Sequence, residues 1–362
     1  MPSSRLAKQI TDMNMKNKKI ALIGGAGFIG HNLALELKRQ GADVSVIDGL
    51  QVNNLLALYC SSYSNLERDL YISMINERMD LLRGSDVPIY VEDARDYARL
   101  SLLMNKIKPE VVVLLAAVSH ASRSNKDPYH TFDHSFRTLE NALDISRGNV
   151  EHFIYFSSSM VYGNFETESV TEEAACNPLG IYGALKFGGE KLVIAYNQVF
   201  GLPYTIVRPS ALYGERCVSR RVGQVFIENA MRGQDIVIKG DGEEKLDFTY
   251  IGDLVEGIRL CIERPEARNQ VFNLTCGQGR SLNEMATIIQ EHFPGINVRH
   301  IDRDALMPER GTLDTSKAAK LVGYKSQFPL AEGYSRYIQW YRELFDRVKS
   351  TPHVAGAPQI NE

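Results

Sequence analysis

Six short apolar runs, rich in β-branched residues, lie between Lys19 and Pro209, and longer segments of helical periodicity separate them. The runs are KIALIGG, ADVSVIDG, PIYVEDA, EVVVLLAA, HFIYFSSS and LPYTIVRP. Strands that alternate with helices form βαβ units, whose strands are parallel and whose helices cover both faces of the sheet. The sequence therefore predicts an α/β fold with a doubly wound parallel sheet. Ligands of such sheets bind beyond the carboxyl ends of the strands.

The pattern becomes less regular after Pro209, which predicts a second, smaller α/β lobe. We expect a nucleotide-binding domain over 18–209, a mainly substrate-binding lobe over 210–349, an N-terminal extension over 1–17 and a flexible tail over 350–362. The long connection after the second strand contains LERDLYISMINERMDLLRG, whose apolar residues recur at helical spacing. This predicts an inserted helix at about 55–85, with a role as a lid, a dimer contact or padding.

Composition excludes several classes of function. The chain has 362 residues, 44% of them apolar, and a formal net charge of -3 without a basic stripe, so nucleic acid is not an expected partner. The longest apolar run, VVVLLAAV, is too short to cross a bilayer. The N-terminus lacks the apolar core of a secretion signal, and we expect a cytoplasmic protein. Its five cysteines are widely spaced, and its histidines show no metal-ligand spacing, so neither disulfides nor a metal site is expected.

The segment after the first strand reads GGAGFIG and precedes a helical stretch. Glycines at 24, 27 and 30 permit a tight turn, close approach of backbone amides to a pyrophosphate and close packing of helix on strand. Asp48 ends the second strand, where a carboxylate binds the adenosine ribose hydroxyls and repels a 2′-phosphate. These residues predict a Rossmann-type site for NAD rather than NADP. Asp93, after the third strand, either binds the adenine amino group or caps a helix.

The fifth strand ends in SSSMVYG, and Tyr182 and Lys186 follow in PLGIYGALK. Residues four apart share one face of a helix, so the phenol of Tyr182 and the ammonium of Lys186 are expected to lie side by side. They are either ordinary surface residues or a pair that handles a proton. Beside a nicotinamide, Lys186 would lower the pKa of Tyr182 toward the working pH. Tyr182 would then take a proton from a sugar hydroxyl, with Ser158 sharing the hydrogen bond of that hydroxyl.

These motifs, in this order, resemble the extended short-chain dehydrogenase/reductase family, and within it the nucleotide-sugar epimerases and dehydratases. The similarity extends from Lys19 to Arg347 and includes RPSALYG, KGDGEEKLDFTYIGD and LDTSKAAKLVGY. The resemblance implies catalysis by Ser158, Tyr182 and Lys186. It implies that NAD is held by Gly24, Gly27, Phe28, Ile29, Gly30, Asp48, Asp93, Ala94, Ala116, Tyr182 and Lys186.

Several residues depart from the family pattern. The dehydratases carry an Asp-Glu pair after the catalytic Ser/Thr, where this chain has Ser159 and Met160; methionine cannot act as a base, so dehydration is disfavoured. His134 replaces an asparagine, and Leu246 replaces the arginine that clamps the substrate diphosphate. Lys245, Arg216, Arg220 or Arg310 must then neutralise the diphosphate, although each taken singly is more typical of a surface charge than of a ligand; Arg310 and Arg216 are the best candidates. The expected substrate contacts are Ser119, His120, Ser159, Arg216, Lys245 and Arg310, with His120 otherwise a hydrogen-bonded residue near a strand end.

The predicted function is an NAD-dependent nucleotide-sugar epimerase, of the 4-epimerase type on a nucleoside-diphosphate hexose. The alternatives are a nucleotide-sugar dehydrogenase or ketoreductase with net redox turnover, and a dinucleotide-sensing protein without turnover. The resemblance also implies a homodimer that pairs through helices near Leu179–Phe200 and Ala94–Lys106. Four apolar residues of these helices either supply that contact or face the core: Leu100, Leu103, Leu185 and Val193.

Overall fold

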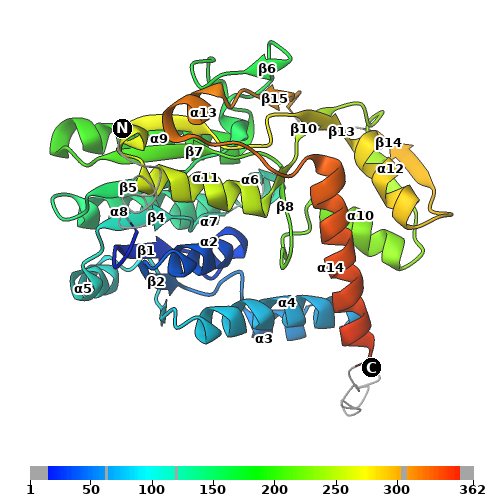
Figure 1. The fold of residues 1–362 in the computed structure, drawn as a ribbon, viewed down its shortest axis with the longest axis horizontal. Helices are drawn as coiled ribbons and strands as arrows, with labels where there is room; N and C mark the ends of the chain where they lie inside the picture. Colours follow the sequence, from blue (N-terminus) through cyan, green and yellow to red (C-terminus); the bar gives the residue numbers. More distant parts are fainter. Residues whose placement is uncertain (1–14, 62–63, 119–120, 303–307, 351–362) are drawn as a thin grey trace, which may run out of the picture.

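The computed structural model describes residues 15–61, 64–118, 121–302 and 308–350 (Figure 1). Within these ranges the central sheet has seven parallel strands in the order β12-β7-β5-β4-β1-β2-β3. The strands are β1 (Lys19–Ile23), β2 (Asp43–Asp48), β3 (Ile89–Val91), β4 (Val111–Leu114), β5 (His152–Phe156), β7 (Tyr204–Arg208) and β12 (Gln270–Asn273). All six predicted strands are confirmed. The seventh, β12, comes from beyond Pro209, so the second segment of the chain also contributes to the first domain.

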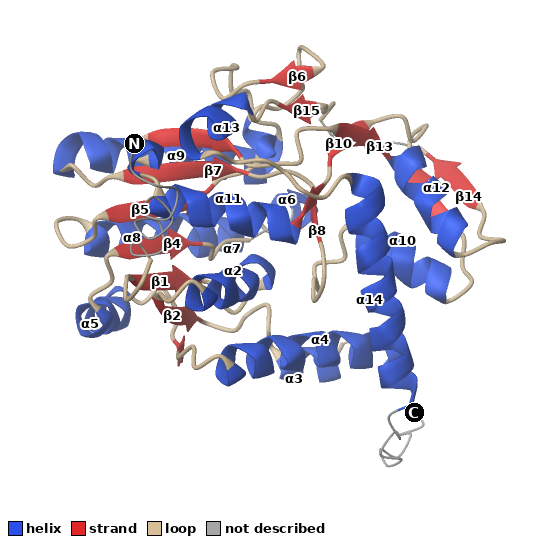
Figure 2. Cartoon of the chain, viewed as in Figure 1, coloured by secondary structure: helices blue, strands red, loops and turns tan. Residues whose placement is uncertain are grey.

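Helices cover both faces of the sheet (Figure 2). The side chains of β1 show why, because successive residues of a strand point to opposite faces. Ile20 and Leu22 pack in one core with α2 (Phe28–Arg39) and α11 (Ile251–Glu263). Ala21 and Ile23 pack in the other core with α5 (Tyr97–Ile107), α8 (Thr138–Ser146) and α9 (Gly180–Phe200). Both faces of β1 are thus buried, as expected of a strand between two helical layers.

The predicted insertion is helical. It contains α3 (Leu55–Tyr59) and α4 (Asn65–Gly84), and α4 begins at a capping box in which Ser64 and Glu67 bond reciprocally to backbone amides. Along its length α4 packs against α2 and against α14 (Leu330–Ser350). The hydroxyl of Tyr71 donates to Glu228 Oε2 at 3.0 Å and joins α4 to α10 (Val222–Met231). The insertion therefore touches both the nucleotide-binding domain and the second lobe.

The second lobe is built around α10, α12 (Leu282–His292) and α14 (Figure 1). Its other elements are β8 (Leu212–Tyr213), β9 (Ile236–Lys239), β10 (Lys245–Asp247), β11 (Thr249–Tyr250), β13 (Gly279–Ser281), β14 (Val298–Ile301), β15 (Thr312–Leu313), which pairs with β6 (Ser169–Val170), and α13 (Ser316–Val322). Shorter helices complete the chain: α6 (Ala121–Lys126), α7 (Pro128–Phe132), a π-helix (Asp133–Arg137) and 3-10 turns (Ser159–Val161 and Pro265–Ala267). No helix in the described ranges has the length and apolar character needed to span a membrane.

Candidate active site

The glycine loop joins β1 to α2 in a conformation that only glycine adopts easily. Gly24 has φ +83°, and a Cβ there would lie 2.5 Å from the backbone nitrogen of Ala116. A Cβ on Gly30 would lie 2.5 Å from the Cα of Gly25, so glycine at 30 lets α2 approach the loop closely. Gly27 caps α2 without a side-chain hydrogen bond. The amides of the first helical turn, which include Phe28 and Ile29, thus keep no side-chain acceptor, as an anion site at a helix terminus requires.

Two carboxylates lie at the neighbouring strand ends. Asp48 accepts from the Ala26 amide at 2.9 Å and from the Leu50 amide at 2.7 Å, and burial raises its pKa. Asp93 instead forms a salt bridge with Arg95 at 2.6 Å, which lowers the pKa of Asp93. Asp93 also accepts from the Arg95 amide at 3.0 Å rather than serving as an N-cap, a role that Asp96 fills for α5.

The loop after β3, which contains Ala94, is anchored by a residue that the sequence did not single out. Asn141 of α8 donates to the carbonyl oxygens of Ala94 and Arg95 at 3.1 and 2.8 Å. Only the structure shows that Asn141 is buried between polar partners. The helical pattern of the sequence does not distinguish a buried asparagine from one on the surface.

The predicted catalytic residues lie at the end of β5 and on the first turns of α9. The side chains of Ser158 and Tyr182 share a hydrogen bond, and Ser158 is 8% exposed. Lys186 is buried one turn after Tyr182; its Nζ donates to the Phe156 carbonyl at 2.7 Å and lies 6.0 Å from the centroid of the Tyr182 ring. The carbonyl anchor on β5 keeps the ammonium on the sheet side of α9. The predicted side-by-side arrangement of phenol and ammonium is present.

The electrostatics of this group differ from the sequence expectation in one respect. Burial raises the pKa of Tyr182, and the effects that oppose it are the charge of Arg221 and the Ser158 hydrogen bond. The expected lowering is absent from the chain by itself, because burial penalises the phenolate more than its neighbours stabilise it. Burial also lowers the pKa of Lys186 to about 8, against the opposing charge of Glu190. Arg221, the N-cap residue of α10, is the second residue that sequence reasoning missed.

The model of the NAD dependent epimerase/dehydratase family matches residues 20–275. The chain belongs to this family. The family is the extended group of the short-chain dehydrogenase/reductases, and the chain is accordingly an NAD-dependent enzyme of that type.

Similar proteins agree with this assignment. YtcB of Bacillus subtilis, an uncharacterized UDP-glucose epimerase, is 28% identical over 331 residues, which cover 90% of this chain and 99% of YtcB. The structure of the Thermotoga maritima UDP-glucose 4-epimerase with UDP-glucose is 25% identical, has a TM-score of 0.75, and aligns over 90% of this chain and 98% of its own. The Bacillus cereus UDP-glucuronic acid 4-epimerase, in complex with UDP-glucuronic acid and NAD, is 25% identical with a TM-score of 0.76 over 90% and 99% of the two chains.

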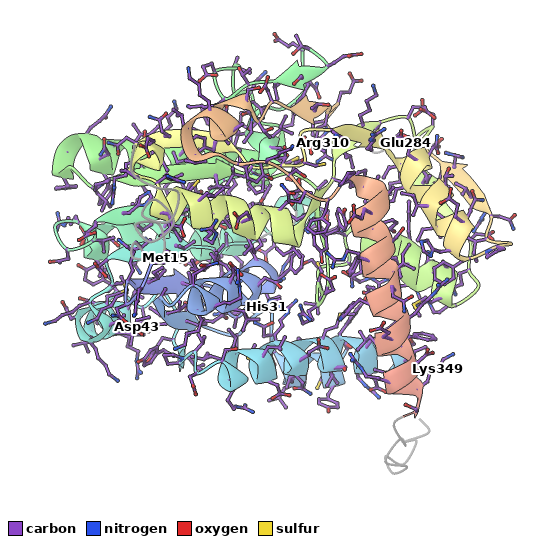
Figure 3. The ribbon with its side chains drawn as sticks, viewed as in Figure 1. Met15, His31, Asp43, Glu284, Arg310 and Lys349 are labelled. Atoms are coloured by element: carbon purple, nitrogen blue, oxygen red, sulfur yellow. The ribbon has the colours of Figure 1, made fainter. Side chains whose placement is uncertain are left out.

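In this family member the second lobe brings one of the predicted arginines to the serine turn. Arg310 is half-buried; its Nη1 lies 4.0 Å from Met160 Sδ, and its Nε lies 3.7 Å from Glu244 Oε1. Figure 3 shows Arg310 between the two lobes, away from His31 and α4. Because Met160 is two residues after Ser158, this geometry brings the guanidinium near the end of β5.

The other predicted substrate contacts are placed differently. Ser159 is 2% exposed and its Oγ bonds to Ser210 Oγ at 3.2 Å. Lys245 is exposed on β10, and its neighbour Leu246 is buried in the core. Ser119 and His120 lie outside the described residues. His134 lies in the π-helix Asp133–Arg137, a conformation that often marks functional sites.

The side chain of Arg216 contacts α2, α4 and α14. Its guanidinium donates to His31 Nε2 at 3.0 Å and to Glu77 Oε1 at 2.9 Å, and it lies over the Trp340 ring. Arg220 forms a salt bridge with Glu67 at 3.3 Å. Both arginines therefore join the second lobe to α4, and these contacts favour a structural role for each over the predicted phosphate contact.

Proposed function

We propose that the chain is an NAD-dependent 4-epimerase of a nucleoside-diphosphate hexose. The observation that carries the proposal is the Ser158–Tyr182 hydrogen bond with the Lys186 ammonium beside it, at the carboxyl edge of the sheet next to the glycine loop. Similarity to 4-epimerases of UDP-sugars supports it. This arrangement suits removal of a proton from a ring hydroxyl.

The glycine loop suits the pyrophosphate of NAD, because glycine at 24 and 30 permits the tight turn and the close packing of α2, and α2 offers amides without a side-chain cap. Asp48 suits the adenosine ribose hydroxyls. When bound, NAD supplies the acceptor for a hydride from the sugar carbon and the donor that returns it.

The chain itself handles the proton and the charges. Tyr182 takes the proton of the hydroxyl on the reacting carbon and returns it after the keto-sugar has turned over, while Ser158 orients that hydroxyl. The nearby Arg221 charge and the Ser158 hydrogen bond favour the phenolate, and the Lys186 ammonium suits the ribose hydroxyls of NAD. Arg310, which enters from the second lobe, is the best placed of the predicted cations to neutralise the substrate diphosphate.

Two features favour epimerisation over dehydration. The Asp-Glu pair of the dehydratases is replaced by Ser159, whose hydroxyl is occupied by Ser210, and by Met160, whose thioether cannot exchange a proton at neutral pH. Water elimination needs an acid and a base at these positions. The remaining alternative is a dehydrogenase or ketoreductase, which uses the same first half-reaction but releases its products.

One assay separates these activities. The purified chain is incubated with UDP-glucose, UDP-glucuronic acid and UDP-N-acetylglucosamine, and with GDP-, CDP- and dTDP-sugars, while products are followed by NMR and NADH by absorbance. We expect a 4-epimer to accumulate without net NADH. Stoichiometric NADH would establish the dehydrogenase alternative, and tight NAD binding without turnover of any of these sugars would refute the proposed activity on them.

We also propose that the chain forms a homodimer through α9 and its neighbour α7. Leu100, Leu103 and Val193 are buried within the chain, so for these three residues the core is the correct alternative. The large apolar side chains exposed near the start of α9 belong instead to Ile181 of α9 and to Tyr129 and Phe132 of α7. A second copy of this chain would cover them.

A further inference from the structure

The insertion carries an arginine that is entirely buried. Arg78 of α4 is 0% exposed, and burial lowers its pKa to about 10, so the guanidinium stays charged at neutral pH. Its Nη1 donates to Asn53 Oδ1 at 2.8 Å, and its Nε donates to the Arg216 carbonyl at 2.9 Å, which Nη2 also contacts. A buried charge is costly unless its hydrogen bonds are made. The hydrogen bonds of Arg78 connect it to the glycine loop, through Asn53 and through Arg216.

The first connection passes through Asn53. This side chain is 5% exposed, and its Nδ2 donates to the Ala26 carbonyl at 2.9 Å. The amide of Ala26 donates in turn to Asp48 Oδ2 at 2.9 Å. The backbone N–H of Ala26 is thus held by Asp48, the residue expected to bind the adenosine ribose. Its backbone C=O is held by Asn53, which Arg78 holds in turn.

The second connection passes through Arg216. Its backbone takes the left-handed conformation, with φ +62°, and its carbonyl meets Arg78 while its side chain meets His31. The Nδ1 of His31 donates to the Gly27 carbonyl at 2.9 Å, and its Nε2 accepts from Arg216. Figure 3 shows His31 on the side of α2 that faces α4. Glu77 of α4 completes this connection through its salt bridge with Arg216.

The charge of Arg78 is not neutralised by contact with a carboxylate. Among the ion pairs in the described residues, none includes Arg78; the charge of Asp48 raises the pKa of Arg78 without an ion-pair contact, and the charge of Arg216 lowers it. The positive charge therefore lies behind a loop whose front surface offers helix amides to an anion. A bound diphosphate would add negative charge to that of Asp48, the carboxylate whose charge already raises the pKa of Arg78.

We propose that Arg78 is a positioning residue for the cofactor: it holds Ala26 and Gly27 in the conformation that binds the pyrophosphate, so the 55–85 insertion is part of the NAD site. The inference rests on the placement of NAD at the glycine loop under the proposed function. It assigns the insertion a role that neither a lid nor padding would have.

The test measures binding rather than turnover. Full-length chain is freed of bound nucleotide, and its Kd values for NAD and ADP-ribose are determined by calorimetry, with adenosine measured by ligand-observed NMR. In Arg78→Met the Kd for NAD and for ADP-ribose should rise about tenfold, because the Asn53 and Arg216 acceptors lose their donor and the loop relaxes. The affinity for adenosine, which lacks phosphates, should change by less than about twofold. A general disturbance of the fold would weaken the binding of adenosine as well.

Two further variants keep the test decisive. Asn53→Ala breaks the connection to Ala26 while the Arg78 charge remains, and it should raise the same two Kd values even if Arg78→Met does not fold. Tyr71→Phe removes a bond between α4 and α10 without touching the loop, and it should leave the Kd for NAD within about twofold. The proposal is overturned if folded Arg78→Met and Asn53→Ala bind NAD as the wild type does, or if Tyr71→Phe weakens binding equally. A wild-type chain that does not bind NAD would instead refute the proposed function.

Discussion

At the scale of single residues, the proposed chemistry depends on one phenol. Tyr182→Phe removes the group that exchanges the proton, and kcat should fall roughly a hundredfold or more, the usual contribution of general acid–base catalysis. The ring and the cofactor contacts remain, so NAD binding should be retained. Rates with the best substrate of the sugar screen and calorimetry with NAD check both expectations. Tyr97→Phe, which removes an exposed hydroxyl bonded to Asp144, is the control, and equal rates in both variants would contradict the assignment.

A second residue-scale prediction concerns pH. Burial and the charges of Arg78 and Arg216 hold the pKa of His31 well below its usual value. The unfolded chain binds this proton below about pH 6.5 and the folded chain does not, so the contribution to stability is complete above that pH and is lost as the pH falls. Between pH 7 and 5.5 the wild type should therefore lose about 1 kcal/mol more than His31→Gln in urea unfolding.

A slope remains in that variant, because burial also lowers the pKa of His152 to about 3. Identical pH dependence of the wild type and His31→Gln would show that His31 has the same pKa in the folded and unfolded chains.

At the scale of elements, the junction between β1 and α2 requires glycine. Gly24→Ala places a Cβ against the Ala116 backbone in a left-handed conformation, and the free energy of unfolding should fall by about 2–4 kcal/mol. Affinity for NAD should fall with it. Denaturant unfolding and calorimetry measure the two effects.

Gly84→Ala is the matched control for that change. Nothing lies within 4 Å of a Cβ at Gly84, which ends α4, and alanine favours helix, so stability should be unchanged or rise by about 0.5 kcal/mol. A loss comparable to that of Gly24→Ala would show that the cost does not arise from the loop geometry.

At the scale of the whole molecule, the prediction concerns assembly. Tyr129 on α7 is 79% exposed and Leu102 on α5 is 73% exposed, so each can accept a charge without disturbing the fold. Tyr129→Glu should convert the dimer to a monomer in analytical ultracentrifugation, because it buries a carboxylate in an apolar contact. Leu102→Glu tests the α5 surface that the family resemblance implied, and we expect it to leave the dimer intact. The reverse result would place the interface on α5.

The sequence by itself predicted the strands, the glycine loop, the inserted helix and the Tyr182–Lys186 pair, because each depends on residues close together in the chain. Periodicity reports which side of an element is buried, and spacing reports which side chains share a helix face. The seventh strand, β12, escaped prediction because it lies among less regular segments and gains its place only by pairing with β7.

Only the tertiary structure shows which of the arginines are buried and what they contact. Arg78 and Arg216 are bonded across 138 positions of sequence, and no local pattern distinguishes a guanidinium that will be buried behind a glycine loop from one that will remain in water. The raised pKa of Tyr182 has the same origin, since burial depends on the packing of both lobes. Local motifs therefore determined the chemistry that this chain can perform. Long-range packing determined the electrostatic setting in which it is performed.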